Sequence, residues 1–507
     1  MRSPGARIWT AGFLLVLVGC SSSGGSARPE PAGSTAAVSP TTSPSATSTT
    51  GASTAPADPS TTAVEPRSTA LGDPADCPLG SLEQASKPVQ ITLWYFWTGG
   101  RGDVTKALVD EFNASQDEVV VNAEFQGGPL NTEVIDKYSR SLDDGSAPDV
   151  VSDAGANSQS YLDLDSTVPV GACVAAAGDD LSDMLPAALA TGVDGDTLEA
   201  MPWGSGGQVL YYNRAAFTAA GLDPDKPPTT LAEVRAASQA IMASGAAKHG
   251  LSILASTIVM SGLFGRSGEP WATDESGLGR ADHSNGGGPF GVALMTELQQ
   301  MVDSGELIAF PSSDPNPDDL LSVATGDSAM AIAAAGGLGD VIAALDAGVG
   351  PGVELGVAPA PSFGDKVSVQ LEGSGAPFWL NRGDDPAKLE AAYRFVAWMT
   401  APAQIAEWVV KTGSIAIRTT AFDEPSLQQY WAANPLFRVA TDQVADPDKP
   451  VVAGNARVGT AAVAAEFDDA AAAILIDGAD PVERLTEASK TADAAIADYN
   501  ARSSSTG

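Results

Sequence analysis

Three tryptophans stand where predicted strands or loops end, and they could offer a flat surface to a ligand. Each lies beside glycine, proline or polar residues: Trp97, Trp203 and Trp271. An indole ring can cover the C–H face of a sugar or glycerol unit while nearby polar groups bind its oxygens. Packing in a hydrophobic core is the alternative for each. Tryptophans inside strand or helix patterns are assigned to packing: Trp94, Trp398 and Trp408.

A glycine-flanked hydroxyl adds polar groups to this set. Gly373 and Ser374 lie in the run Glu372-Gly-Ser-Gly between two apolar segments, where glycine lets backbone N–H groups approach a ligand oxygen. We therefore predict that Gly373 and Ser374 contact a ligand.

Few residues of this chain could take part in catalysis. The only histidines are His249 and His283, which limits base-assisted nucleophiles and histidine metal sites. No Gly-x-Ser-x-Gly elbow and no phosphate-binding glycine loop occur. We expect no enzyme, no metal and no cofactor. A carboxylate-pair glycosidase stays open, because 63 acidic residues offer many pairs.

The charge of the chain bears on its partners. With 63 acidic and 27 basic residues, the formal net charge is −36. Nucleic acid and anionic membrane surfaces are therefore poor partners for the bulk surface, and we expect no nucleic acid. We expect a monomer that touches a membrane only through a lipid anchor.

The start of the chain has the pattern of a lipoprotein signal. Arg2 and Arg7 precede an apolar run, Ile8 to Val18, that is too short to span a bilayer as a mature helix. The run ends in Leu-Val-Gly-Cys20, which predicts a signal peptide over residues 1–19 and lipid on Cys20. An ordinary secretory signal is the alternative. The predicted localisation is extracytoplasmic, anchored to the cell membrane.

Residues 20–76 are dominated by Ser, Thr, Ala, Gly and Pro, and predict a disordered tether that could be glycosylated on its hydroxyls. The chain has three cysteines. With Cys20 assigned to lipid, Cys77 and Cys173 form an even pair in an oxidising compartment, and we predict a disulfide between them.

The elements that must position these residues alternate between strand and helix. Strand patterns occur at 89–97, 119–125 and 148–151, separated by helical patterns that include Val104, Leu108 and Phe112. This alternation predicts an α/β fold with a mostly parallel sheet and helices on both faces. A later helix has Asn213 as a predicted N-cap, and the next has a capping box in Thr230 and Glu233.

Several stretches together resemble family 1 extracellular solute-binding proteins, the receptors of bacterial importers driven by ATP hydrolysis. The stretches are LWYFWTGG, APDVVSD, VLYYN followed by AF..AGLDP..PPTT..E, GDSAMAI and EAAYRFVAWMTAPAQIAEWVVKTG with SIAIR. The likeness covers most of residues 89–425 and points to the branch that binds glycerol-3-phosphate and glycerophosphodiesters.

This resemblance implies a two-lobe, periplasmic-binding-protein-like fold of type II, a Venus flytrap with crossover strands between its lobes. We place lobe 1 at 77–207 plus about 326–372, and lobe 2 at about 208–325 plus 373–507. The implied function is capture of a carbohydrate or glycerophosphodiester-type solute in the interlobe cleft and its delivery to an ABC importer permease.

The resemblance also suggests site residues. It gives ligand contacts to Ser205 and Asp153. Arg418 matches the arginine that closes a family segment, and its guanidinium could bind a phosphate bidentately or a sugar hydroxyl less strongly. Ser414 and Ala416 stand where that segment has tyrosine and proline, so the solute itself stays open between a phosphodiester and a neutral sugar. A surface-anchored adhesion or scaffold protein is the alternative from another class.

Overall fold

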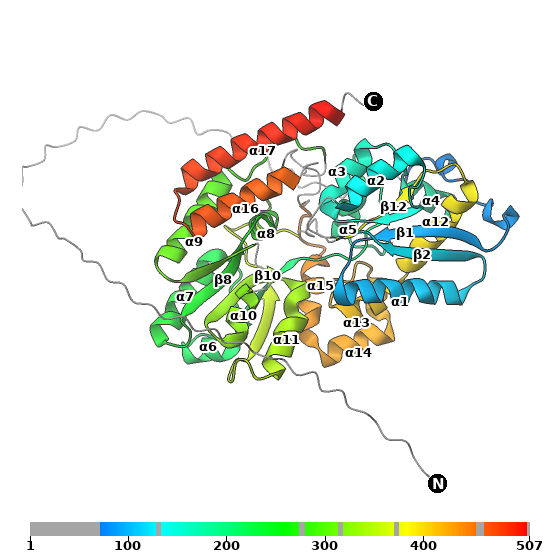
Figure 1. Ribbon diagram of the computed structural model, residues 1–507. Coiled ribbons are helices and arrows are strands. Elements are labelled where there is room, and N and C mark those ends of the chain that lie inside the picture. Colours follow the sequence, from blue (N-terminus) through cyan, green and yellow to red (C-terminus); the bar gives the residue numbers. More distant parts are fainter. Residues whose placement is uncertain are drawn as a thin grey trace, which may run out of the picture. The chain divides into compact units, whose positions relative to one another are not determined.

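The structure is a computed structural model that describes residues 71–127, 133–272, 279–312, 318–369, 375–452 and 461–503. Two five-stranded sheets organise these residues, each with helices packed against it (Figure 1). A short ladder joins β5 (Val193–Asp194) to β6 (Thr197–Leu198). The sequence prediction of an α/β, two-lobe fold is confirmed.

The first sheet has the strand order β2-β1-β3-β12-β4. Its strands are β1 (Val89–Tyr95), β2 (Val119–Phe125), β3 (Val150–Ser152), β4 (Thr167–Val168) and β12 (Phe378–Asn381). Helices in these parts of the chain are α1 (Gly99–Ser115), α2 (Glu133–Asp144), α3 (Ser158–Asp163), α4 (Val170–Ala177), α5 (Pro186–Gly192), α12 (Pro386–Met399), α13 (Pro402–Thr412), α14 (Pro425–Ala433) and α15 (Val439–Val444). Strand β1 is parallel to β2 and β3, so segments that follow β1 and β3 leave the sheet at the same edge.

The second sheet has the order β11-β7-β10-β8-β9. Its strands are β7 (Gln208–Asn213), β8 (His249–Ala255), β9 (Leu307–Pro311), β10 (Ser328–Ala334) and β11 (Leu355–Pro359). The remaining helices are α6 (Arg214–Ala219), α7 (Leu231–Ser244), α8 (Thr257–Arg266), α9 (Pro289–Asp303), α10 (Asp318–Thr325), α11 (Leu338–Asp346), α16 (Ala461–Leu475) and α17 (Pro481–Ser503). Strand β7 is antiparallel to both of its neighbours, whereas β8 is parallel to β9 and β10.

The strands of segment 326–372 lie in the second sheet, which corrects their predicted place in the first lobe. Met330 of β10 pairs with Tyr212 of β7, and β11 borders β7 on its other side. The chain returns to the first sheet at β12, which is antiparallel to β3. Residues from Ala376 to Val444 accordingly join the first core, although the sequence placed them in the second lobe. Both β10 and β12 are apolar strands, so local pattern does not decide which sheet takes which strand.

The C-terminal helices complete the second core. Helices α16 and α17 lie side by side (Figure 1) and both pack against α9. Phe467, Ile474, Leu485 and Ile496 are buried in the same cluster as Leu251 of β8. One hydrophobic core is therefore built from strands in mid-sequence and from helices near the end of the chain.

Local capping follows the sequence closely. The Asn213 side chain accepts hydrogen bonds from the backbone N–H groups of Ala215 and Ala216 at the start of α6. At α7, Thr230 and Glu233 form the predicted capping box. These side chains satisfy N–H groups that would otherwise lack partners at a helix start.

Cys77 and Cys173 form a disulfide, as the sequence predicts. Both are buried, and the bond ties the segment before β1 to helix α4. Cys20 and the proposed tether up to residue 70 lie outside the described residues.

Candidate functional site

Trp97 lies just beyond the end of β1, at the edge where the parallel strands β1 and β3 finish. Its ring centroid is 4.4 Å from that of Phe96 and 6.2 Å from that of Trp408. A Cβ atom on Gly204 would lie 3.1 Å from Cζ2 of Trp97, and Gly204 has a φ of +60°. Glycine is therefore favoured there, because a side chain would be strained by the left-handed backbone and would crowd the indole.

Ser205 follows Gly204 on the segment that leads into β7, and it meets two later parts of the chain. Its backbone oxygen accepts a hydrogen bond from Ile415 N at 3.3 Å. A Cβ on Gly375 would be 3.8 Å from Ser205 Oγ, so the residue after Gly373 and Ser374 borders this hydroxyl. The Ser205 side chain is buried.

Trp203 packs into the first core. Its ring lies 4.8 Å from that of Trp408 and 5.5 Å from that of Phe378, and 1% of the residue is exposed. Its backbone oxygen accepts a hydrogen bond from Ala376 N at 2.7 Å. Trp203 therefore positions the Gly204–Ser205 turn, and its indole is engaged in packing.

Asp153 follows β3 and stands against the same segment before β12. Its carboxylate accepts hydrogen bonds from Ala154 N at 2.7 Å, Asn157 Nδ2 at 2.9 Å and Tyr161 Oη at 3.0 Å. Burial raises the pKa of Asp153 to about 6, although these three hydrogen bonds lower it. The next backbone N–H group, that of Gly155, donates to Gly375 O at 2.8 Å. Asp153 is thus beside the cluster, with its oxygens occupied by neighbouring donors.

Arg418 lies in an acidic corner of the first lobe. Its Nη1 is 2.5 Å from Asp183 Oδ1 and 3.5 Å from the Asp180 backbone oxygen. Thr420 also donates to the Asp183 carboxylate. Nε of Arg418 has no hydrogen-bond partner within the part of the chain that the structure describes. The ion pair with Asp183 neutralises the guanidinium charge of Arg418, which we expected from the sequence to bind a ligand.

Trp271 lies in the second core, where its contacts are those of packing. Its ring makes edge contacts with Phe264 at 5.1 Å and with Phe467 of α16 at 5.0 Å, and 2% of the residue is exposed. A Cβ on Gly286 would be 3.0 Å from Trp271 Cη2. The Trp271 ring therefore packs in a hydrophobic core, which is the alternative to ligand binding given above, because helix α16 covers it.

The remaining residues named from the sequence are Gly373, Ser374 and the tryptophans assigned to packing. Gly373 and Ser374 lie outside the described residues. The tryptophans assigned to packing do pack: Trp398 lies 5.5 Å from Phe112, and Trp408 contacts both Trp97 and Trp203. Trp94, which is half-buried, also donates from Nε1 to Glu124.

Arg101 is a candidate site residue that the sequence analysis missed. It lies in the first turn of α1, and its guanidinium carbon is 4.9 Å from the centroid of the Trp97 ring. Burial lowers the pKa of Arg101, and the charge of Asp340 acts in the opposite direction. The signal was present in the sequence, since Arg101 follows the Thr98-Gly99-Gly100 turn beside a predicted ligand wall.

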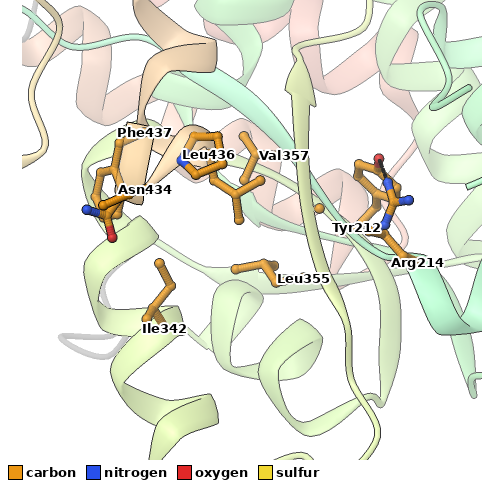
Figure 2. Close-up of a pocket in the computed structure, with 11 residues that line it drawn as sticks. Tyr212, Arg214, Ile342, Leu355, Val357, Asn434, Leu436 and Phe437 are labelled. Carbon is orange, nitrogen blue, oxygen red and sulfur yellow. Dashed lines mark hydrogen bonds between the residues drawn. The ribbon is translucent and has the colours of Figure 1, made fainter. Parts of the chain in front are cut away.

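A pocket of about 530 Å³ lies elsewhere, beside the end of β7 (Figure 2). Figure 2 shows the side chains of Ile342, Leu355, Val357 and Leu436 gathered around it. Arg214, which also lines the pocket, forms an ion pair with Asp225. None of the site residues predicted from the sequence lines this pocket, and its walls are mainly apolar. It is a poor match for a polar, hydroxyl-bearing solute.

Two further properties concern the described residues alone. They contain no group of three or more histidine, cysteine or carboxylate side chains placed to hold a metal ion. None of their helices is long and apolar enough to cross a membrane.

Known proteins share both the sequence pattern and the fold. The sn-glycerol-3-phosphate-binding periplasmic protein UgpB of Yersinia pestis is 25% identical over 380 residues, covering 72% of this chain and 82% of that protein. UgpB from Mycobacterium tuberculosis, solved in complex with glycerophosphocholine, has a TM-score of 0.63 and 21% identity over 81% of this chain and 99% of that one. The sugar-binding protein MalE from Xanthomonas citri has a TM-score of 0.68 and 17% identity, with coverages of 81% and 98%.

The structural matches establish the fold, and a family match adds the class of protein. Residues 107–435, more than half of the chain, match the family described as bacterial extracellular solute-binding protein. That family consists of receptors that bind solutes, which agrees with the scarcity of catalytic residues. The chain belongs to the family of bacterial extracellular solute-binding proteins.

Proposed function

We propose that this protein captures a carbohydrate, glycerol-3-phosphate or glycerophosphodiester in a cleft between its lobes and delivers it to the permease of an ABC importer. The observation that carries the proposal is the meeting of four segments at one sheet edge. Trp97 after β1, Asp153 after β3, Ser205 before β7 and Gly375 before β12 are joined by the contacts described above. Ligands of α/β proteins bind at such edges.

The relatives support this range of solutes. One is named for glycerol-3-phosphate, one was solved with glycerophosphocholine and one is named as sugar-binding. All three solute classes present hydroxyl groups, which suit the Ser205 hydroxyl and the nearby backbone of Gly375.

The mechanism is a shift in population between open and closed lobe arrangements. A solute that contacts both lobes favours the closed form by as much as its affinity for that form exceeds its affinity for the open one. The closed form then docks on the permease, and the solute is released without any covalent change. The protein is therefore a receptor and not an enzyme.

The membrane attachment belongs to the same proposal. Lipid on Cys20, after removal of residues 1–19, would hold the receptor near its permease, and the Ser- and Pro-rich residues 20–76 would give it reach. Mass spectrometry of the mature N-terminus checks this. A Cys20→Ala chain should lose the lipid mass and separate from membranes, and an unlipidated mature wild-type chain would contradict the anchor.

Binding calorimetry with the purified chain tests the receptor function. Glycerol-3-phosphate, glycerophosphocholine and maltose are titrated separately, and the recovered solute is analysed for chemical change. We expect saturable binding of at least one and no product. Ser205→Ala should weaken that binding by about 2- to 10-fold, because one hydrogen bond is lost.

The matched control is Ser261→Ala, which removes a buried serine hydroxyl from α8. It should leave the affinity unchanged. Failure to bind any of the three solutes, or conversion of one to a product, would refute the receptor function. Equal losses in both serine variants would remove Ser205 from the site.

A further inference from the structure

Arg101 occupies a position between the end of β1 and a segment of the second lobe. Its guanidinium lies over the Trp97 ring, with Cζ at 4.9 Å from the ring centroid. A Cβ atom on Gly336 would also collide with Nη2 of Arg101. Gly336 belongs to the short helical turn Ala335–Gly337, which directly follows β10. The missing side chain at Gly336 therefore leaves room for the guanidinium.

The bonding of Arg101 differs from that of the other sheltered arginines. The remaining arginines that are buried or half-buried in the described chain all have hydrogen-bond or ion-pair partners: Arg214, Arg235, Arg266, Arg418 and Arg484. For the guanidinium of Arg101, no described residue accepts a hydrogen bond or forms an ion pair, and the one opposite charge that acts on its pKa is the exposed carboxylate of Asp340. Sheltering a cation from water without such a partner costs free energy. A bound anion would supply the missing partner.

We propose that Arg101 is a specificity-determining residue that binds a phosphate group of the solute, so that the solute is a phosphomonoester or phosphodiester and not a neutral sugar. This inference rests on the proposed receptor function. The guanidinium offers five N–H donors in one plane, a geometry that matches two phosphate oxygens. Stacking on Trp97 holds that plane in place before the solute arrives.

The surroundings of Arg101 agree with this role. Arg101 lies over the Trp97 indole, and a Cβ atom on Gly204 would lie 3.1 Å from that indole. Ser205 is the next residue. A phosphate on Arg101 therefore places the rest of the solute beside the Ser205 hydroxyl. Arg418 is a weaker candidate for the phosphate, because Asp183 already neutralises it. The Trp97 face is covered by a cation, so it is closed to a quaternary amine.

The test measures solute affinity in the full chain by calorimetry, with glycerol-3-phosphate and glycerophosphocholine as phosphate probes and maltose as the neutral probe. We expect the wild-type chain to bind at least one phosphate probe. Arg101→Gln keeps most of the side-chain volume and should weaken that binding by about 10- to 100-fold, as loss of a charge-assisted contact requires. Arg101→Lys should recover part of the loss, because it restores the charge without the planar fork.

The control is Arg140→Gln, the same change at an exposed arginine on α2, which should leave affinity unchanged. Thermal unfolding of each variant verifies that it is folded. Wild-type binding of maltose alone would overturn the phosphate inference and leave the receptor function standing, as would equal affinities in the wild type and Arg101→Gln. Absence of binding to every probe would overturn both.

Discussion

At the scale of single residues, Asp153 shows how a buried carboxylate can serve the backbone around it. Its three donors, Ala154, Asn157 and Tyr161, come from the turn and the helix that follow β3. Desolvation outweighs these bonds and raises the pKa to about 6 from an ordinary value of 3.8. The charged form is thus disfavoured in the folded state, and Asp153 fixes local structure at an electrostatic cost.

That cost predicts a dependence of stability on pH. With a raised folded-state pKa, the contribution of Asp153 to stability is complete below about pH 4 and is lost as the pH rises through about 6. Relative to Asp153→Asn, which does not ionise, the wild-type chain should lose up to about 3 kcal/mol of unfolding free energy between pH 4 and pH 7. Denaturant unfolding of both chains at several pH values measures this. A difference that stays constant across the range would contradict it.

Sequence could point to some residues of the proposed site and could not point to others. Trp97 and Ser205 could be proposed because each follows or precedes an apolar strand in a segment with a family likeness. Trp271 has the same surroundings in sequence, yet it is covered by Phe467, almost two hundred residues later. The sequence shows that Arg101 is close to Trp97 along the chain, but only the folded turn shows that its guanidinium lies over that ring.

At the scale of elements, helix α16 decides the role of Trp271. Phe467 of α16 is fully buried and makes an edge contact with that ring. Phe467→Ala should therefore lower the free energy of unfolding by about 3–5 kcal/mol, through lost burial and a cavity. Ile476→Ala, just beyond α16 at a residue that is 44% exposed, should change it by less than about 1 kcal/mol. Denaturant midpoints measure both, and similar small losses would show that α16 does not seal this core.

Elements defined by local chemistry were predicted well, and their partners were not. The caps at Asn213 and Thr230 depend only on nearby residues, so sequence was sufficient. The sheet to which β10 or β12 belongs depends on which distant strand is available for pairing. Both strands are mainly apolar, and their pairing with β7 or β3 assigns them to different sheets.

At the scale of the whole molecule, Asp163 connects helices of different lobes. It ends α3 and accepts hydrogen bonds from Tyr499 Oη of α17 at 2.6 Å and from Arg280 Nη1 at 3.1 Å. Arg280 Nη1 also donates to Asn500 Oδ1 at 3.0 Å. These contacts require the lobes to approach each other on this side.

We therefore expect the Tyr499 hydroxyl to favour the closed form. Tyr499→Phe should weaken solute binding by about 2- to 10-fold, since one hydrogen bond to a carboxylate is lost away from the solute. Tyr430→Phe is the control, because no described residue is a hydrogen-bond partner of that hydroxyl. Calorimetry gives the affinities, and small-angle scattering should show a larger radius for Tyr499→Phe with solute present. Unchanged affinity and radius would mean that Asp163 does not couple to closure.

The late position of α16 and α17 has a consequence for biogenesis. The core around Leu251 remains incomplete until residues 461–503 have left the ribosome, since those residues supply Phe467, Ile474, Leu485 and Ile496. A nascent chain therefore stays loosely folded in that half throughout synthesis. Secretion machinery that translocates unfolded polypeptide would therefore receive a chain that cannot finish folding before its synthesis ends.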